Sequence, residues 1–167
     1  MSSSMSSSHA RRAFLLTAGA LMVSLAIGSH ANAAEPEAVK IGLVAALSGN
    51  SALSGEAITR GLSIAIDEIN ARGGVMGGRK LVLVRRDDES NPSKGQLAAR
   101  ELIEKENVAI VFGGIDTPVS AALVNVMQEL KRPYMGVWAA GTGITRHGKT
   151  PNYMFAYLQS MNGSIWR

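Results

Sequence analysis

The sequence predicts an α/β protein built on a doubly wound parallel sheet. Short apolar segments rich in β-branched residues alternate with amphipathic segments from Val39 onward, and glycine or proline pairs separate them. The composition, with 46% apolar and 18% charged residues among 167, is that of a globular protein. Strands that alternate with helices in this way form parallel sheets with right-handed crossovers.

The first strand is predicted at residues 39–46, an apolar stretch typical of a buried parallel strand. A polar loop follows at residues 47–54, and Ser54 can cap the next helix. Gly73-Gly74 ends that helix. Its apolar stripe has helical spacing and consists of Ile58, Leu62, Ala65, Ile66 and Ile69.

The second strand is predicted at residues 81–84. Asn91-Pro92 then supplies a cap and a proline at the first position of a helix that runs to about Lys105. Residues 108–112 are the third predicted strand, and Gly113-Gly114 makes the turn that follows it.

Asp116-Thr117-Pro118 opens the third predicted helix. Residues 134–138 form the fourth predicted strand, and residues 152–156 are a candidate fifth. The predicted buried face of the third helix has six members: Val119, Ala122, Leu123, Val126, Met127 and Leu130.

A ligand site in such a sheet lies beyond the carboxyl ends of the strands, where the strand order reverses. With the order 2-1-3-4, that point falls between the first and third strands. The loops concerned are residues 47–54 and 113–117, with residues 139–145 beside them. Their small residues let backbone amides approach a ligand, and their hydroxyl groups offer orienting hydrogen bonds.

Thr117 is a candidate ligand contact in these loops. At a helix N-terminus its hydroxyl can donate a hydrogen bond to a carboxylate, and free backbone N–H groups add to the favourable field. The alternative is that Thr117 only caps its helix while Gly113-Gly114 only makes the turn. Two interpretations also stay open for Asp87-Asp88-Glu89 after the second strand, a metal or ribose site or a solvated strand end.

Several function classes are disfavoured by what the sequence lacks. Without cysteine there is no disulfide, thiolate metal site or cysteine nucleophile. The three histidines, His9, His30 and His147, form no metal-ligand pattern, and we predict no catalytic residue, metal or cofactor. The motifs G-x-G-x-x-G and G-x-x-x-x-G-K-[ST] are both absent, which disfavours nucleotide-dependent enzymes. A net charge of +4 gives no reason to expect nucleic acid as a partner.

Residues 1–33 are predicted to be a secretory signal peptide, and residues 34–167 the mature chain. The uncharged apolar run at residues 13–27 has about 15 residues, fewer than the roughly 20 of a membrane span. Ala31-Asn32-Ala33 is an A-x-A cleavage site. The alternative is an uncleaved N-terminal anchor.

The start of the leader resembles the twin-arginine export motif, which Arg11-Arg12 followed by Phe14 and Leu15 would satisfy. Ala10 and Leu16 replace the usual serine and lysine, so both this route and general secretion stay open. Either route predicts a periplasmic or secreted product.

The sequence resembles the type I periplasmic solute-binding proteins, and more closely the branched-chain amino acid (Leu/Ile/Val) binding proteins of ABC importers. The resemblance covers roughly residues 39–155 and rests on three matching segments. These are Val39-Lys40-Ile41-Gly42-Leu43 with Leu47-Ser48-Gly49, the glycine-rich stretch from Asp67 to Leu81, and Asp87-Asp88 followed by Asn91-Pro92. It implies the strand order 2-1-3-4-5 and an N-terminal lobe that is incomplete and truncated before the second lobe.

The resemblance also implies ligand contacts. Ser54 stands where the family has a residue that covers the ligand, and Thr117 stands where a hydroxyl binds the ligand carboxylate. Ala140 and Thr142 match an A-x-T pattern that offers a backbone carbonyl and a hydroxyl. Asp116 departs from the family, because an acid beside this site opposes an anionic ligand; relatives also take amides, urea or aromatic acids.

The function implied is that of a solute-binding component of an ABC importer, with no enzymatic activity. Its partners would be a small-molecule ligand, namely an amino acid or analogue, and a membrane permease. Two alternatives are a ligand-sensing lobe of a receptor-type protein and a secreted Rossmann-like enzyme. A titratable constellation in the pocket would favour the enzyme, and none is visible in the sequence.

Overall fold

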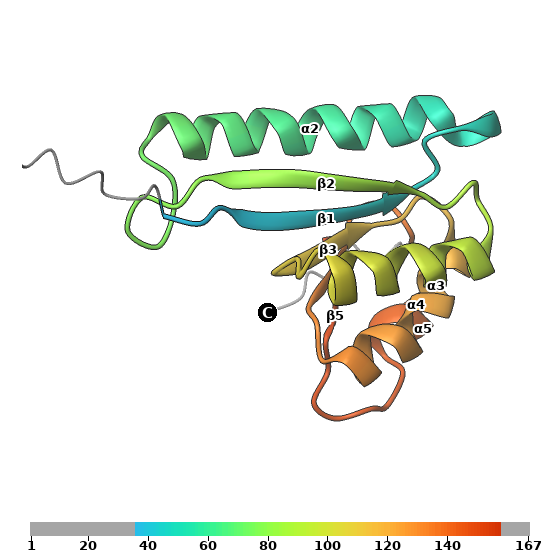
Figure 1. The fold of residues 1–167 in the computed structure, drawn as a ribbon. Helices are drawn as coiled ribbons and strands as arrows, with labels where there is room; N and C mark the ends of the chain where they lie inside the picture. The colour runs from blue at the N-terminus through green and yellow to red at the C-terminus, as the bar shows by residue number, and fades with distance from the viewer. Residues whose placement is uncertain (1–35, 158–167) are drawn as a thin grey trace, which may run out of the picture. The chain divides into compact units, whose positions relative to one another are not determined.

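The computed structural model describes residues 36–157 (Figure 1). The predicted signal peptide lies outside these residues. The elements in chain order are β1 Val39–Ala45, η1 Gly49–Ser51, α2 Ala52–Ala71, β2 Leu81–Asp87, α3 Pro92–Arg100, η2 Glu101–Lys105, β3 Ile110–Gly113, α4 Thr117–Leu130, β4 Tyr134–Gly136, α5 Thr142–Thr145 and β5 Met154–Ala156.

Within the described part, five parallel strands form one sheet in the order β2-β1-β3-β4-β5. The predicted doubly wound α/β class and the strand order are therefore confirmed. In Figure 1, α2 lies along one face of the sheet over β1 and β2, whereas α3 and α4 lie on the opposite face. None of the helices among these residues is both long and apolar enough to cross a membrane.

All five strands differ from the predicted ranges by one to three residues at an end, and the largest difference is at β2. β2 continues to Asp87 instead of ending at Val84, because Arg85, Arg86 and Asp87 keep pairing with the last three residues of β1. The backbone ladder thus carries the strand through a polar stretch that the apolar pattern could not follow. The helix predicted to reach Lys105 does so, but its last turn is the π-helical η2.

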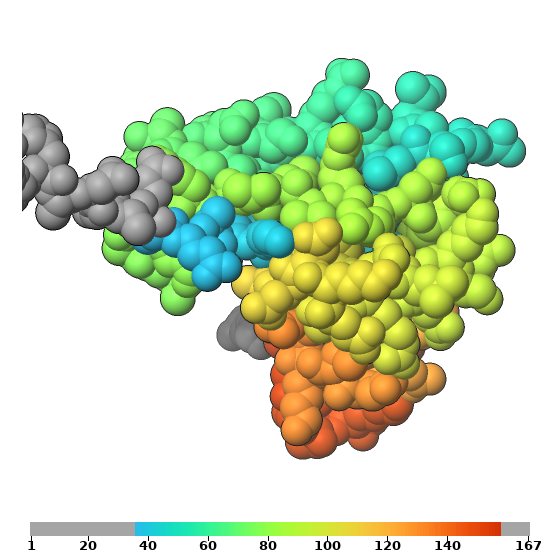
Figure 2. All heavy atoms as spheres, viewed as in Figure 1, coloured from blue at the N-terminus to red at the C-terminus, as the bar shows by residue number. Residues whose placement is uncertain are grey.

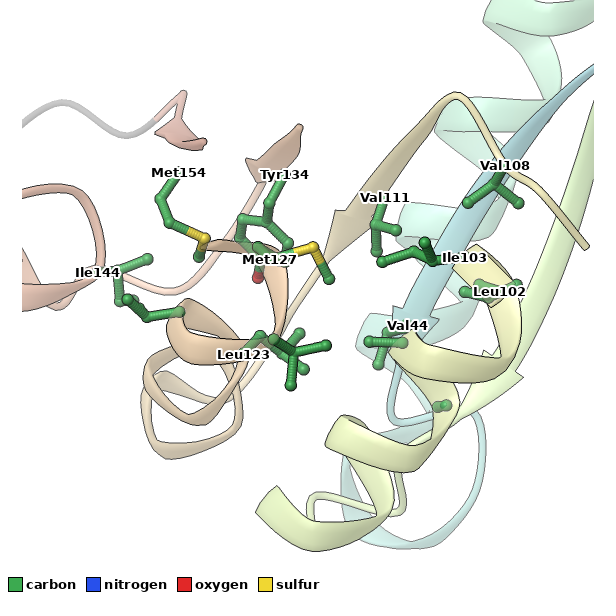
Figure 3. Packing of buried hydrophobic residues seen from close by; sticks show 14 of the residues in the cluster. Val44, Leu102, Ile103, Val108, Val111, Leu123, Met127, Tyr134, Ile144 and Met154 are labelled. Carbon is green, nitrogen blue, oxygen red and sulfur yellow. The ribbon is translucent and has the colours of Figure 1, made fainter. Parts of the chain in front are cut away.

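The larger core cluster lies between the sheet and helices α3 and α4. Figure 3 shows Leu123 and Met127 of α4 turned towards Tyr134 and the neighbouring strands. All three side chains are fully buried. The predicted buried face of α4 is confirmed, with Ala122 and Leu130 at its half-buried margins.

The α2 face of the sheet has a smaller core. Leu43, Ala45 and Ile58 form its buried part, and Phe112 packs against it from β3. Ala65, predicted on the apolar stripe of α2, is exposed, because this helix covers only the β1–β2 half of the sheet. On β5, Phe155 is 49% exposed.

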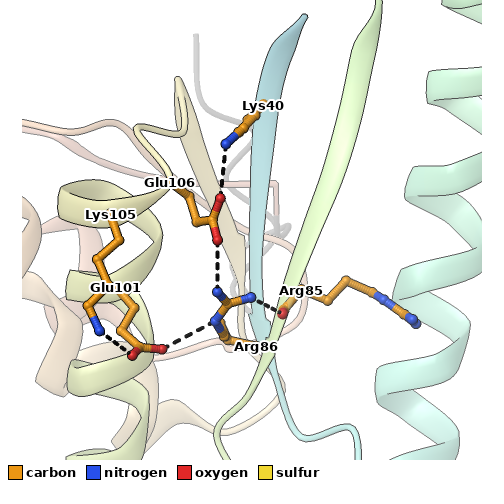
Figure 4. Close-up of polar contacts among 6 residues, drawn as sticks. All are labelled: Lys40, Arg85, Arg86, Glu101, Lys105 and Glu106. Atoms are coloured by element: carbon orange, nitrogen blue, oxygen red, sulfur yellow. Dashed lines mark hydrogen bonds and ion pairs between the residues drawn. The ribbon is translucent and has the colours of Figure 1, made fainter.

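A chain of alternating charges ties η2 to the first two strands on the α3 side (Figure 4). Glu106 accepts hydrogen bonds from Lys40 Nζ over 2.9 Å and from Arg86 Nη2 over 3.1 Å. Glu101 binds Arg86 Nε at 3.3 Å and Lys105 Nζ at 2.8 Å. The hydrogen bonds from Lys40 and Arg86 lower the pKa of Glu106.

Asn91 caps α3 as predicted. Its side-chain oxygen accepts hydrogen bonds from the backbone N–H groups of Ser93 at 2.9 Å and Lys94 at 3.1 Å, and Pro92 takes the first helical position.

In the space-filling view, α2 lies at the top and the segment from β4 to β5 lies at the bottom, in orange and red (Figure 2).

Candidate functional site

Three helices begin just beyond the carboxyl ends of β1, β3 and β4. The predicted contacts Ser54, Thr117 and Thr142 lie in the first turns of α2, α4 and α5, and Ala140 lies in the loop before α5. Ser54 is half-buried, whereas the other three are exposed. All four predicted residues therefore lie at the sheet edge where ligands bind in doubly wound folds.

The loops after β3 and β4 are joined by backbone hydrogen bonds. Val137 N donates to Gly113 O over 2.9 Å, and Ala139 N donates to Gly114 O over 3.1 Å. Further along, a Cβ atom placed on Gly141 would lie only 2.6 Å from Cγ2 of Thr117. The structure thus brings Thr117 and the Ala140–Thr142 segment together.

Thr117 is not the cap of its helix. Asp116 occupies the N-cap position, and its carbonyl oxygen accepts the hydrogen bond of Ser120 N at 3.0 Å. The Thr117 hydroxyl is exposed and makes no hydrogen bond within residues 36–157. The simple capping interpretation is therefore wrong, and the hydroxyl remains free for a ligand.

Ser54 is not a helix cap either. The N-cap position of α2 is Ser51 and the helix begins at Ala52, so Ser54 is already in the first turn. The neighbouring Gly55 lies very close to the end of the first strand: a Cβ there would overlap the carbonyl oxygen of Ala46. The lack of a side chain lets the helix pack directly on the end of β1. No hydrogen bond links Ser54 to the other three candidates in the described part.

Asp87 holds the loop after β1. Its Oδ1 accepts hydrogen bonds from Leu47 N and Glu89 N, both at 2.9 Å. Burial raises the pKa of Asp87, but the hydrogen bonds from Ser48, Glu89 and Leu47 outweigh burial and bring the pKa below its usual value.

Across residues 36–157, no three His, Cys, Asp or Glu side chains are grouped to hold a metal ion.

Asp88, next to it, is only 1% exposed. Its Oδ1 accepts a hydrogen bond from Ser90 N over 2.8 Å. Burial raises the pKa of Asp88, and the nearby charges of Asp116 and Asp87 raise it further. The solvated strand end is thus wrong for this residue, which is a buried acid behind the candidate site.

Asp116 points a buried oxygen into the protein. Its Oδ2 has no hydrogen-bond partner in the described region, and its charge acts on Asp88. The carboxyl group of Asp116 therefore lies near enough to that of Asp88 for the two charges to interact. At least one oxygen of Asp116 is therefore turned away from solvent.

Sequence reasoning missed a buried hydrogen bond beneath the site. Tyr134 and Ser120 are both 0% exposed, and the Tyr134 hydroxyl donates to Ser120 Oγ over 2.8 Å. A Cβ on Gly114 would lie 2.8 Å from the same Ser120 oxygen. This bond joins β4 to α4 directly below the turn that precedes Thr117. The one signal in the sequence that could have indicated this bond is the position of a polar residue, Ser120, on the buried face of a helix.

Trp138 was also not predicted as a site residue. It follows β4 at the start of the loop that carries Ala140, and its side chain is 52% exposed. An exposed indole beside a candidate site offers an apolar, aromatic surface to a ligand.

Comparison with known proteins finds one matching family and many relatives. The model of the family described as "Periplasmic binding protein" matches residues 38–164. The chain is 38% identical over 130 residues to the Leu/Ile/Val-binding protein homolog 7 of Brucella melitensis. This match covers 76% of the chain and 32% of the relative.

Many solved structures share the fold, among them two that hold a bound carboxylic acid. One is the branched-chain amino acid transporter substrate-binding protein LivJ of Streptococcus pneumoniae in complex with isoleucine, at 28% identity and a TM-score of 0.66. This match covers 72% of the chain and 33% of LivJ. The other is a solute-binding protein of an ABC transporter from R. palustris in complex with benzoate, at 37% identity and a TM-score of 0.58, with 65% of this chain covering 29% of it.

The described sheet matches one lobe of the type I binding-protein fold, including its strand order. The chain spans about a third of the length of the relatives it matches.

Proposed function

Because the chain belongs to the periplasmic binding protein family, we propose that it forms the N-terminal lobe of the solute-binding component of an ABC importer. The lobe would consist of residues 34–167. It binds a small carboxylate, with a branched-chain amino acid as the first candidate, and passes it to a membrane permease. The observation that carries this proposal is the free hydroxyl of Thr117 at the N-terminus of α4, beside the Ala140–Thr142 segment.

The chemistry of the α4 N-terminus suits a carboxylate. The first N–H groups of a helix lack partners within the helix, and the helix dipole favours negative charge there. The exposed hydroxyls of Thr117 and Thr142 can donate two further hydrogen bonds. Isoleucine and benzoate, the molecules bound in the two similar structures, share a carboxylate group.

Aromatic acids are the second candidate. The exposed face of Trp138 beside Ala140 favours them, because aromatic rings pack well against an indole. The benzoate-bound relative is also more similar in sequence than the isoleucine-bound one. We propose no enzymatic activity for either ligand class.

Ligand binding is tested with a two-lobed chimera, in which residues 34–157 of this chain precede the remaining part of the Brucella melitensis relative. Titration calorimetry with isoleucine and with benzoate ranks the two ligand classes. We expect Thr117→Ala and Thr142→Ala each to weaken binding by about 1–3 kcal/mol, the usual loss when a charged group loses a hydrogen-bond partner.

Ser93→Ala is the matched control for these variants. Ser93 also lies in the first turn of a helix and is exposed, but it follows β2 at the other side of the sheet. Its removal should leave affinity unchanged. Unchanged affinity in both threonine variants would refute the site.

We also propose that the protein is exported to the periplasm after cleavage between Ala33 and Ala34. The A-x-A sequence after an apolar run supports this location. Mass spectrometry of periplasmic protein should find Ala34 as the first residue. An exported product that retains Phe14 would contradict the proposal.

A further inference from the structure

We propose that Gly141 is the residue that positions Thr117 for ligand binding. This inference rests on the proposed function and deepens it, because it identifies what fixes the direction of the Thr117 hydroxyl. The backbone conformation at position 141 does not require glycine. Gly141 has φ −68° and ψ 119°, a conformation that any L-amino acid adopts without strain.

The need for glycine is instead steric. A Cβ at position 141 would meet Cγ2 of Thr117 at 2.6 Å and Cδ1 of Ile144 at 3.4 Å. The first distance is far below ordinary van der Waals contact, which for carbon atoms begins near 3.5 Å. The space that a side chain would fill at position 141 is therefore already occupied by the methyl group of Thr117.

Seating this methyl group determines where the hydroxyl points. In threonine, Cγ2 and Oγ1 are bonded to the same Cβ atom, so one χ1 angle sets both positions. With the methyl group against Gly141, the hydroxyl is held on another side of Cβ, where it is exposed and free of protein partners in the described chain. A ligand meets a hydroxyl that is already oriented.

Both sides of this contact are anchored. Ile144 is 2% exposed, and its N–H donates to the carbonyl oxygen of Gly141 over 3.0 Å. Ala139, just before the loop, is tied to Gly114. On the other side, the backbone around Thr117 is held by the Ser120–Asp116 hydrogen bond. An alanine at position 141 must therefore turn the Thr117 side chain instead of displacing the loop.

The test uses the two-lobed chimera with Gly141→Ala, Thr117→Ser and the double variant. Serine keeps the hydroxyl but removes the methyl group that the new alanine would strike. We expect Gly141→Ala to weaken carboxylate binding about tenfold or more and Thr117→Ser to weaken it only about threefold. The double variant should bind about as well as Thr117→Ser alone, because the clash is gone.

Gly143→Ala is the control. A Cβ there would meet no atom within 4 Å, although Gly143 lies only two residues away, in the first turn of α5. The Gly143→Ala variant should leave ligand affinity unchanged. An unaffected affinity in Gly141→Ala would overturn the inference. So would a double variant whose loss of affinity equals the product of the two single losses.

Thermal unfolding separates this inference from the proposed function. Gly141→Ala should lower Tm, and adding Thr117→Ser should restore it, whether or not any ligand binds. Absence of carboxylate binding by the unchanged chimera, together with this Tm rescue, refutes the function and leaves the Gly141–Thr117 contact supported. The contact is refuted if Thr117→Ser does not restore the Tm of Gly141→Ala. The same conclusion follows if Gly141→Ala and the double variant both fail to fold.

Discussion

The hydrogen bond between Tyr134 and Ser120 should be a measurable part of the stability of the sheet–helix core. Both side chains are 0% exposed and the two oxygens lie 2.8 Å apart. Tyr134→Phe removes the donor and should destabilise the fold by about 1–2 kcal/mol. Ser120→Ala leaves a buried phenol hydroxyl without an acceptor and should cost about 1–3 kcal/mol.

The double variant distinguishes the hydrogen bond from simple loss of packing. Removing both polar groups together leaves no buried group unpaired, so its destabilisation should fall short of the sum by about 1 kcal/mol. Urea unfolding followed by circular dichroism measures these differences. With a slope of about 1–2 kcal/mol per molar urea, Tyr134→Phe should lower the midpoint by about 1 M.

Tyr157→Phe is the control, because Tyr157 is 86% exposed and its hydroxyl is free to meet water. Its midpoint should match that of the unchanged chain. Strict additivity of Tyr134→Phe and Ser120→Ala would refute the reasoning, since it would mean that the two groups do not act as a pair.

Two further predictions concern α3 and the acid before it. Asn91→Ala should destabilise the protein by about 0.5–2 kcal/mol in thermal unfolding, because the N–H groups of Ser93 and Lys94 lose their acceptor, whereas Asn91→Asp should be tolerated. Burial raises the pKa of Asp88 in the folded protein above its ordinary value of 3.8. The protonated side chain therefore contributes stability at low pH, and this contribution is lost as the pH rises from 3.8 through the pKa of the folded state. Asp88→Asn keeps the acceptor for Ser90 N and should gain stability relative to the unchanged chain as pH rises from 3 to 7; parallel urea midpoints would contradict this.

The strands and most helix faces were predictable because their signals are local. Short apolar runs, Asn91-Pro92 and Asp116-Thr117-Pro118 each act within a few residues of the chain. The close packing of α2 on the loop after β1 was not predictable, since it depends on Gly55 meeting the carbonyl oxygen of Ala46. The exposure of Ala65 likewise depends on how much of the sheet α2 covers.

The candidate site was predictable in outline and not in detail. Strand topology places Thr117 and Thr142 at one sheet edge, and the family resemblance had implied that topology. The contact between Thr117 and Gly141 depends on the packing of two loops that are separate in sequence. The burial of Asp88 depends on α3 and α4 closing over it, which a run of three acidic residues does not reveal.

The place of β1 between β2 and β3 has a consequence for how the chain folds. Ile41 pairs with Leu83 on one side and with Ile110 on the other, so both neighbours of this strand are synthesised well after it. Sheets built from such distant pairings close slowly, because the entropy of long loops is lost before the contacts form. The core of this sheet is therefore expected to assemble more slowly than that of a helical protein of the same size.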